Sequence, residues 1–250
     1  TFQQIKINSG TTITGLTTVT GSVDSNGNED DVIEINGNRD FSGVTFSTLE
    51  EIHLDDGSGT RQTLSASSTT SFGAVEIDGF TVGPGDTTDI FDYTSDLTSG
   101  NGTSRNATSN LTGLTEVATS GKTNLATNVI SNDGNAVIDF ETSQLNQYVS
   151  GLDFTASPST NVVANILAAA EALLEDTSSN PITGSDAQVA QGGANTDALL
   201  IFYESSSDDA DAVIIRYQES GNDPEFDNEL SVVAIFERVG YGDFDAANII

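Results

Sequence analysis

The stretch VIEINGNRDFSGVTFSTLEEIHL, residues 32–54, sets the expectations for the fold. Short apolar runs alternate in it with turn-forming Asn, Gly, Asp and Ser, a pattern typical of β-strands. Similar runs lie on both sides of it, and the whole set is Gln4–Ile7, Val32–Ile35, Val44–Phe46, Ile52–Leu54 and Ala74–Ile77. Because residues 1–100 supply no helical crossovers, the pattern favours a solenoid, a roll or a sandwich over βαβ units.

A five-residue pattern of apolar, Ser or Thr, Gly, aliphatic, and Thr or Asp recurs along the chain. Its copies are Ile13–Thr17, Phe41–Thr45, Leu111–Thr115 and Val149–Asp153. The first two copies start 28 residues apart, which suits one coil of a parallel β-helix. The later intervals need insertions, and chance recurrence stays open because Gly, Ser and Thr are common here. We expect a mainly β protein with a parallel β-helix or β-roll-like region over residues 1–100, and a β-sandwich as the alternative.

The rest of the chain divides into a Thr/Ser-rich region, residues 101–185, and a C-terminal domain, residues 186–250. The first region has one helical pattern, because apolar residues recur at helical spacing from Val162 to Leu174. We expect one amphipathic helix, 161–176, packed on the core. The C-terminal domain has three apolar runs joined by acidic loops, which predict an antiparallel meander. These runs are Ala198–Glu204, Ala212–Gln218 and Leu230–Glu237.

The charge is strongly unbalanced: 38 acidic residues stand against seven basic ones, for a net charge of -31. Such a chain repels itself unless divalent cations or concentrated salt offset the field. Acidity also disfavours nucleic-acid backbones and anionic membranes as partners. The scarcity of Lys leaves a halophilic origin open, but the acids are mainly Asp in loops, which favours ion binding.

Other compositional features remove whole classes of chemistry. The chain has no Cys, which excludes disulfides, zinc–thiolate sites and thiol nucleophiles. It has no apolar run long enough to span a bilayer, so no membrane span is expected. No initiator Met or N-terminal secretory signal is visible, so an export signal is expected near the C-terminus.

Catalysis has little support in the sequence. The lone His53 lies in a strand pattern and is expected to be a surface or packing residue rather than a base. No Gly-x-Ser-x-Gly elbow, His-Glu-x-x-His motif or phosphate-binding Gly loop occurs. Paired carboxylates carry no information in so acidic a chain. We therefore expect a protein that is not an enzyme.

Oxygen-rich loops are candidate calcium sites, because Ca²⁺ takes six to eight oxygen ligands on flexible loops. An EF-hand is excluded, since Glu29 stands where that loop needs Gly and Ile35 stands at its twelfth position. The alternative is that these residues are solvated turn residues, which Asp and Asn favour for backbone reasons. The candidate ligands are Asp24, Asn26, Asn28, Asp30, Asp31, Asp55, Asp56, Asp86, Asp89, Asp197, Asp208, Asp209, Asp211, Asp223, Asp227 and Glu229.

Two parts of the chain resemble known bacterial proteins. Residues 30–35, 41–46 and 49–57 look like the spacer repeats of large RTX-type surface proteins. The three C-terminal runs and the ending 243–250, Asp-Phe-Asp-Ala-Ala-Asn-Ile-Ile, resemble the C-terminal domains of type I-secreted surface proteins, notably the cyanobacterial "bluetail" kind.

This resemblance implies export through an ABC-type channel with an uncleaved C-terminal signal, folding outside the cell, and calcium dependence. The calcium-binding nonapeptide of that family is nowhere intact. Its best copy, residues 192–199, has Asn195 in place of a Gly.

The sequence thus predicts a secreted, calcium-stabilised structural or adhesive protein of a bacterial cell surface that self-assembles through β-rich contacts. Its partners would be further copies of itself, other surface components or glycans. The alternatives are a monomeric calcium-dependent glycan-binding module and a polysaccharide-active enzyme on a β-helix.

Overall fold

The computed structural model describes residues 3–8, 15–22, 31–55, 60–67, 70–84, 87–93, 97–98, 104–105, 115–116, 137–154, 160–175, 197–205, 207, 210–218, 228–240, 243–245 and 247–249. These residues are mainly β, with one α-helix and sheets of parallel and mixed strands, which confirms the coarse fold class. The helix, α3 (Thr160–Glu175), begins one residue before the expected range and ends one residue before its end.

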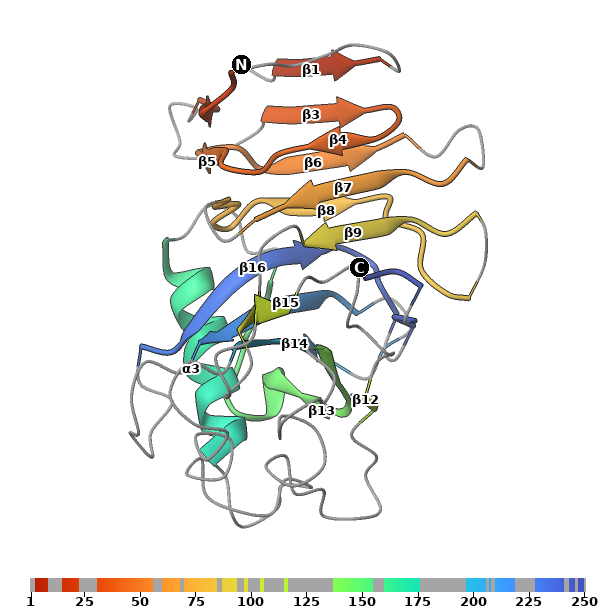
Figure 1. Ribbon diagram of the computed structural model, residues 1–250. Coiled ribbons are helices and arrows are strands. Elements are labelled where there is room, and N and C mark those ends of the chain that lie inside the picture. The colour runs from red at the N-terminus through yellow and green to blue at the C-terminus, as the bar shows by residue number, and fades with distance from the viewer. Residues whose placement is uncertain are drawn as a thin grey trace.

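The N-terminal strands are distributed over three parallel groups, and the chain visits the groups in turn (Figure 1). The first group is β1 (Gln3–Ile7), β3 (Asp31–Ile35), β6 (Glu51–Leu54) and β8 (Glu76–Asp78). The second is β4 (Arg39–Asp40), β7 (Thr63–Ala66) and β9 (Ile90–Tyr93). The third is β2 (Thr18–Thr20) and β5 (Thr45–Ser47), which a bridge from Thr45 to Ser71 extends.

In-register pairing within the first group stacks like residues on one another. Ile5, Ile33, Ile52 and Ile77 form one inward-facing column, which Phe236 of a later strand continues. Parallel neighbours place equivalent side chains side by side, so each layer covers the next. Exposure falls from 56% at Ile5 to 3% at Ile33 and 0% at Ile52. The column is therefore covered everywhere except at its N-terminal end.

The C-terminal strands form the expected antiparallel meander. They are β14 (Asp197–Tyr203), β15 (Ala212–Gln218) and β16 (Leu230–Phe236). The meander does not stand apart, because β16 pairs in parallel with β8 and β14 pairs in parallel with β13 (Val137–Gln144). With β12 (Thr115–Glu116) at the far edge, one sheet runs β1-β3-β6-β8-β16-β15-β14-β13-β12. A separate antiparallel pair is β10 (Leu97–Thr98) and β11 (Ser104–Arg105).

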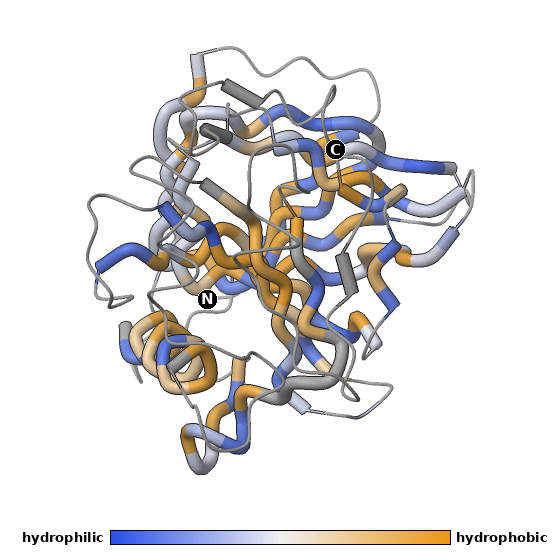
Figure 2. Tube along the Cα trace, turned by 60° about the horizontal axis from the view of Figure 1, so that its bottom comes forward, coloured by the Kyte–Doolittle hydropathy of each residue, from blue (hydrophilic) through white to orange (hydrophobic). Residues whose placement is uncertain are grey.

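The meander is buried on both faces, which explains its continuous apolar runs. On one face, Val213, Ile215 and Ile235 pack with the apolar stripe of α3 and with the 3-10 turn Leu145–Gln147. On the other face, Ile214 and Phe236 belong to the core enclosed by the N-terminal strands. Figure 2 shows hydrophobic residues running along these central strands.

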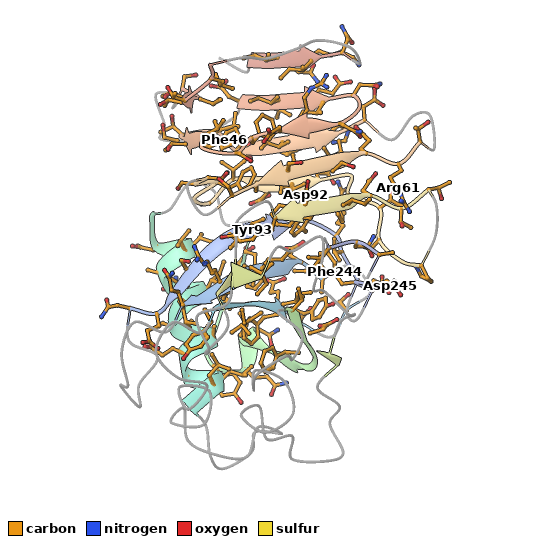
Figure 3. The ribbon with its side chains drawn as sticks, viewed as in Figure 1. Phe46, Arg61, Asp92, Tyr93, Phe244 and Asp245 are labelled. Atoms are coloured by element: carbon orange, nitrogen blue, oxygen red, sulfur yellow. The ribbon has the colours of Figure 1, made fainter. Side chains whose placement is uncertain are left out.

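Phe236 fills the interior where the N-terminal stack ends. Its ring lies 4.8 Å from that of Phe80, 5.5 Å from Phe91 and 5.4 Å from Phe244, measured between centroids. Phe244, labelled in Figure 3, belongs to the final segment, which a bridge from Ile249 to Phe91 places beside β9. These aromatic contacts close the apolar interior at this end.

The final segment is anchored by Asn248, which is fully buried. Its side-chain nitrogen donates to the carbonyl of Asp89 at 2.9 Å, and its side-chain oxygen accepts from the backbone N–H of Gly83 at 3.0 Å. Strands from the first and last thirds of the chain therefore share one core, while the division into three domains stays a prediction. Within the described ranges, no helix combines the length and apolar character needed to cross a membrane.

Gly79 provides a test of the close layer spacing. Its φ is +74°, and a Cβ placed there would lie 2.5 Å from the carbonyl oxygen of Leu54 in the neighbouring layer. Gly15 has the same φ and open space around it. We expect Gly79→Ala to cost about 2–4 kcal/mol of unfolding free energy, from backbone strain and steric clash together. Gly15→Ala should cost about 1 kcal/mol, from strain alone.

Urea denaturation of both variants measures the difference. Equal losses at the two positions would contradict the layer spacing described here.

Candidate functional site

Five charged or titratable side chains gather on the outer surface of the nine-stranded sheet, where β8 meets β16. We call Glu51, His53, Asp78, Glu237 and Arg238 the seam cluster. Glu51 and His53 flank the buried Ile52 on β6, so strand alternation turns both outward. Asp78 lies beside His53 in the register of β6 with β8. Glu237 and Arg238 follow directly after β16.

His53 and Arg238 approach the two oxygens of Asp78 from different sides. His53 Nδ1 lies 2.8 Å from Asp78 Oδ2 and 3.3 Å from Glu51 Oε1. Arg238 donates to Asp78 Oδ1, and its Nε lies 3.3 Å from Glu237 Oε1. The cluster thus links β6, β8 and the end of β16 across the seam.

A shallow pocket of about 320 Å³ opens over this cluster. Its lining residues are His53, Leu54, Asp78, Gly79, Phe80, Thr81, Glu237 and Arg238. The side chain of His53 is 40% exposed and that of Asp78 is 10% exposed. The imidazole of His53 is therefore accessible to a small ligand or ion, while the carboxylate of Asp78 is largely buried.

The carboxyl groups around the seam are partly buried and have few positive charges near them. Burial, together with the charges of Glu237 and Asp211, raises the pKa of Glu76 to about 8. Glu76 pairs with Ile235 of β16, and Ile235 belongs to the apolar core that packs against α3. This apolar neighbour shields Glu76 from water and so explains its desolvation. Burial likewise raises the pKa values of Glu51 and Glu237.

Asp78 behaves in the opposite way. Burial opposes its ionisation, but hydrogen bonds from Arg238 and His53 outweigh burial and hold the pKa of Asp78 below its usual range. Asp78 is thus the firmly ionised member of the cluster.

Two uses of this arrangement are chemically reasonable. The cluster can serve as an ion-pair network that fastens the sheet, or it can hold a divalent cation. Within the part of the chain that the structure describes, Glu51, His53 and Asp78 are the one group of at least three such side chains close enough to share an ion. Among the described lining residues, Thr81 alone carries a hydroxyl.

Most of the sequence-predicted calcium ligands lie outside the described residues. These are Asp24, Asn26, Asn28, Asp30, Asp56, Asp86, Asp208, Asp209, Asp223 and Asp227. The best nonapeptide copy also lies outside them, except for its last three residues. For these positions calcium binding stays a prediction.

The described candidates are spread over separate turns. Asp89 accepts hydrogen bonds from the backbone N–H groups of Gln62 and Thr81, at 2.7 and 2.8 Å. Asp211 accepts from the N–H of Arg238 at 2.9 Å, and Asp31 accepts from the hydroxyl of Ser22 at 2.8 Å.

The remaining described candidates also belong to turns or strand ends. Asp55 accepts from Asn36 at 3.3 Å, Glu229 is buried before β16, and Asp197 begins β14. The structure does not gather these carboxylates into one site. Calcium binding by them stays a prediction.

The seam cluster was missed in the sequence, although one signal could have indicated it. Glu51-Ile52-His53 and Glu76-Ile77-Asp78 both place a buried Ile between two outward polar residues. Aligning the two isoleucines as neighbours brings His53 beside Asp78 and Glu51 beside Glu76, as the structure does. Arg238 had no such signal, because it lies 160 residues from its partner Asp78.

Comparison of the chain with protein-family models, curated proteins and solved structures finds no match.

A carboxylate outside the seam, Glu204, gives the pH dependence of stability. It follows β14, and burial raises its pKa to about 7 from 4.5, with the charges of Asp211 and Asp153 adding to the rise. Because the folded state holds the proton more tightly, the stability contribution is complete below about pH 4.5. It is lost as pH rises through about 7.

We expect Glu204→Gln to match the wild type near pH 4 and to exceed its unfolding free energy at pH 8 by about 1 kcal/mol, after allowance for solvent screening. Urea titrations across this pH range measure the difference. Asp243→Asn, at an exposed carboxylate, is the matched control and should leave the pH profile unchanged. A Glu204→Gln profile parallel to the wild type would contradict the burial of this group.

Proposed function

We propose that this protein is a secreted structural or adhesive component of a bacterial cell surface that assembles by strand addition at β1. The observation that carries the proposal is the uncovered end of the sheet. Among the described strands, β1 has a neighbour, β3, on one side only. Ile5, in the inward column, is 56% exposed and is the one large apolar side chain classed as exposed among the described residues.

An edge strand of this kind can accept another strand. Its outer N–H and C=O groups are free to extend the ladder, and a partner strand would cover Ile5. Antiparallel pairing of two β1 strands about Ile5 would be self-complementary, as a two-fold interface requires.

Charge favours a second copy of this chain at this edge. Copies with a net charge of -31 repel one another most where carboxylates face each other. β1 carries Lys6 and no carboxylate, whereas β3, β6 and β8 each carry acidic residues. Of the two edge strands of this sheet, β1 is therefore the one where two copies meet with less repulsion, because β12 carries Glu116.

A more specific fold for the N-terminal strands is part of the same proposal. We infer that the three parallel groups form a parallel β-helix, because the chain visits them in a constant order. Thr18 pairs with Thr45, and Thr45 with Ser71, so one circuit takes about 27 residues. Stacked coils of this kind make an extended, stiff body, which suits a structural element.

Calcium and an extracellular location complete the proposal. The charge calls for cations, and the absence of Cys and the resemblance to RTX-type, type I-secreted proteins agree with export into a calcium-containing medium. We propose no catalytic role, since the sequence carries none of the nucleophile or metalloprotease motifs of known enzyme classes.

Sedimentation of the full chain tests the assembly. We expect the mass of the wild type to rise above 26.0 kDa with concentration. Ile5→Lys should stay monomeric to concentrations at least about tenfold higher, because a buried unpaired ammonium opposes strand addition. This variant lowers the net negative charge, so added repulsion between copies cannot explain the loss. Ser231→Lys, which adds the same charge on β16, should associate like the wild type.

Sedimentation and thermal unfolding with millimolar calcium, and then with a chelator, test whether calcium binds. Calcium should raise both the association and the thermal midpoint, because a ligand bound only by the folded state stabilises it. A monodisperse wild-type monomer would favour a glycan-binding module or an enzyme instead. An unchanged midpoint would favour the halophilic origin of the acidity.

A further inference from the structure

We infer that Glu51, His53 and Asp78 form a binding site for one transition-metal dication of the zinc class. This site is distinct from the calcium loops and independent of assembly at β1. It lies on the outer surface of the nine-stranded sheet, and its ligands come from the adjacent strands β6 and β8.

The separations of the ligand atoms suit a single ion. One ligand atom from each of Glu51, His53 and Asp78 lies within 4.8 Å of the other two. Ligands at about 2.0–2.2 Å from a tetrahedral Zn²⁺ are about 3.3–3.6 Å apart. His53 Nδ1 already lies 3.3 Å from Glu51 Oε1 and 2.8 Å from Asp78 Oδ2. Side-chain adjustments of about 1 Å would therefore place all three on one ion.

The convergence of two carboxylates on one ring nitrogen is the more telling feature. A hydrogen on Nδ1 can make one good hydrogen bond, which the closer Asp78 takes. Glu51 Oε1 faces the same nitrogen at 3.3 Å. A metal ion on Nδ1 would face both carboxylates at once, with the proton moved to Nε2.

Arg238 prepares Asp78 for this role. It donates to Asp78 Oδ1 and so leaves Oδ2 directed at His53. Hydrogen bonds from outer groups commonly orient the carboxylates that bind metals. Glu237 holds Arg238 in turn, through the contact between Nε and Oε1 at 3.3 Å.

The charges that face the site leave room for a dication. Glu50, Glu51, Asp78 and Glu237 supply acidic groups around the seam besides the largely protonated Glu76, and Arg238 is the one permanently positive side chain among the groups that interact with them. An ion-pair network built for stability alone would be expected to balance its charges more closely. A bound dication would supply the missing positive charge.

The donor set also selects the kind of ion. An imidazole nitrogen with two carboxylate oxygens suits Zn²⁺, Co²⁺, Ni²⁺ or Fe²⁺, whereas Ca²⁺ and Mg²⁺ take oxygen ligands. The pocket over His53 and Asp78 leaves the fourth position open to water. Bound metal would tie β6 to β8 and, through Arg238, to the end of β16.

His53 makes the test specific, because it is the only histidine in the chain. Its ring nitrogens give the only imidazole ¹⁵N signals of the full-length protein. We expect one equivalent of Zn²⁺ at neutral pH to shift the Nδ1 signal and to leave Nε2 protonated, with an affinity in the range of about 1–10 µM. Millimolar Ca²⁺ should leave these signals unchanged.

Two variants separate a defined site from general attraction of cations to an acidic surface. Glu51→Gln should weaken Zn²⁺ binding at least about tenfold, because it removes a charged ligand. Glu34→Gln removes a carboxylate on β3 that lies beside His53 in the strand register but outside the ligand set, and it should change affinity by less than about threefold. Competition with a coloured chelator measures both variants, and far-UV circular dichroism verifies their folding.

Either of two results would overturn the inference. The first is an Nδ1 signal that does not respond to a tenfold excess of Zn²⁺. The second is equal weakening by Glu51→Gln and Glu34→Gln, since a diffuse acidic field would produce that. The wild-type spectra decide the question even if a variant fails to fold.

Discussion

The parallel pairing of β8 with β16 is the interaction on which the rest of the structure depends. A stack of parallel strands has an apolar interior that is open at each end, and water would enter unless something covers it. Phe236 covers one end, because the pairing of Ile77 with Phe236 carries the inward column into the meander. Replacing a fully buried aromatic ring of this kind by Ala costs about 3–5 kcal/mol, which is a large share of a domain's stability.

The same pairing creates the electrostatics of the seam. Where β8 meets β16, the outer face of the sheet passes from solvent to the cover provided by α3. Glu76 lies at this transition and is desolvated. Asp78 lies two residues further along β8 on the same face, and its hydrogen bond from Arg238 keeps it ionised. A chain with few cations places one of them, Arg238, at this junction. The seam is thus both a structural join and the most chemically distinctive surface among the described residues.

The parts of the fold that the sequence predicted are those with a local signal. The meander strands carry long apolar runs because both of their faces are buried, and α3 shows a plain helical period. The pairing of β8 with β16 has no local signal, since parallel neighbours can come from any distance along the chain. His53 looked like an isolated surface histidine for the same reason. Its partner Asp78 lies 25 residues away and is recognised only once the strand register is known.

The acidic loops have a clear local signal in the sequence, but that signal does not identify a binding site. Their composition predicts ion binding, but composition alone cannot say which oxygens converge. At Asp89, both carboxylate oxygens accept backbone N–H groups, which is the turn-stabilising role that Asp commonly has. Register, rather than the abundance of acids, selects the residues that meet.

Hydrogen exchange of a Phe236→Ala variant tests most directly whether one core unites both ends of the chain. The account predicts that amide protection falls by a similar factor in β3 and β6 as in β14 and β15, because all of them depend on the closed interior. Loss of protection confined to β15 and β16, with β3 and β6 at wild-type values, would contradict it.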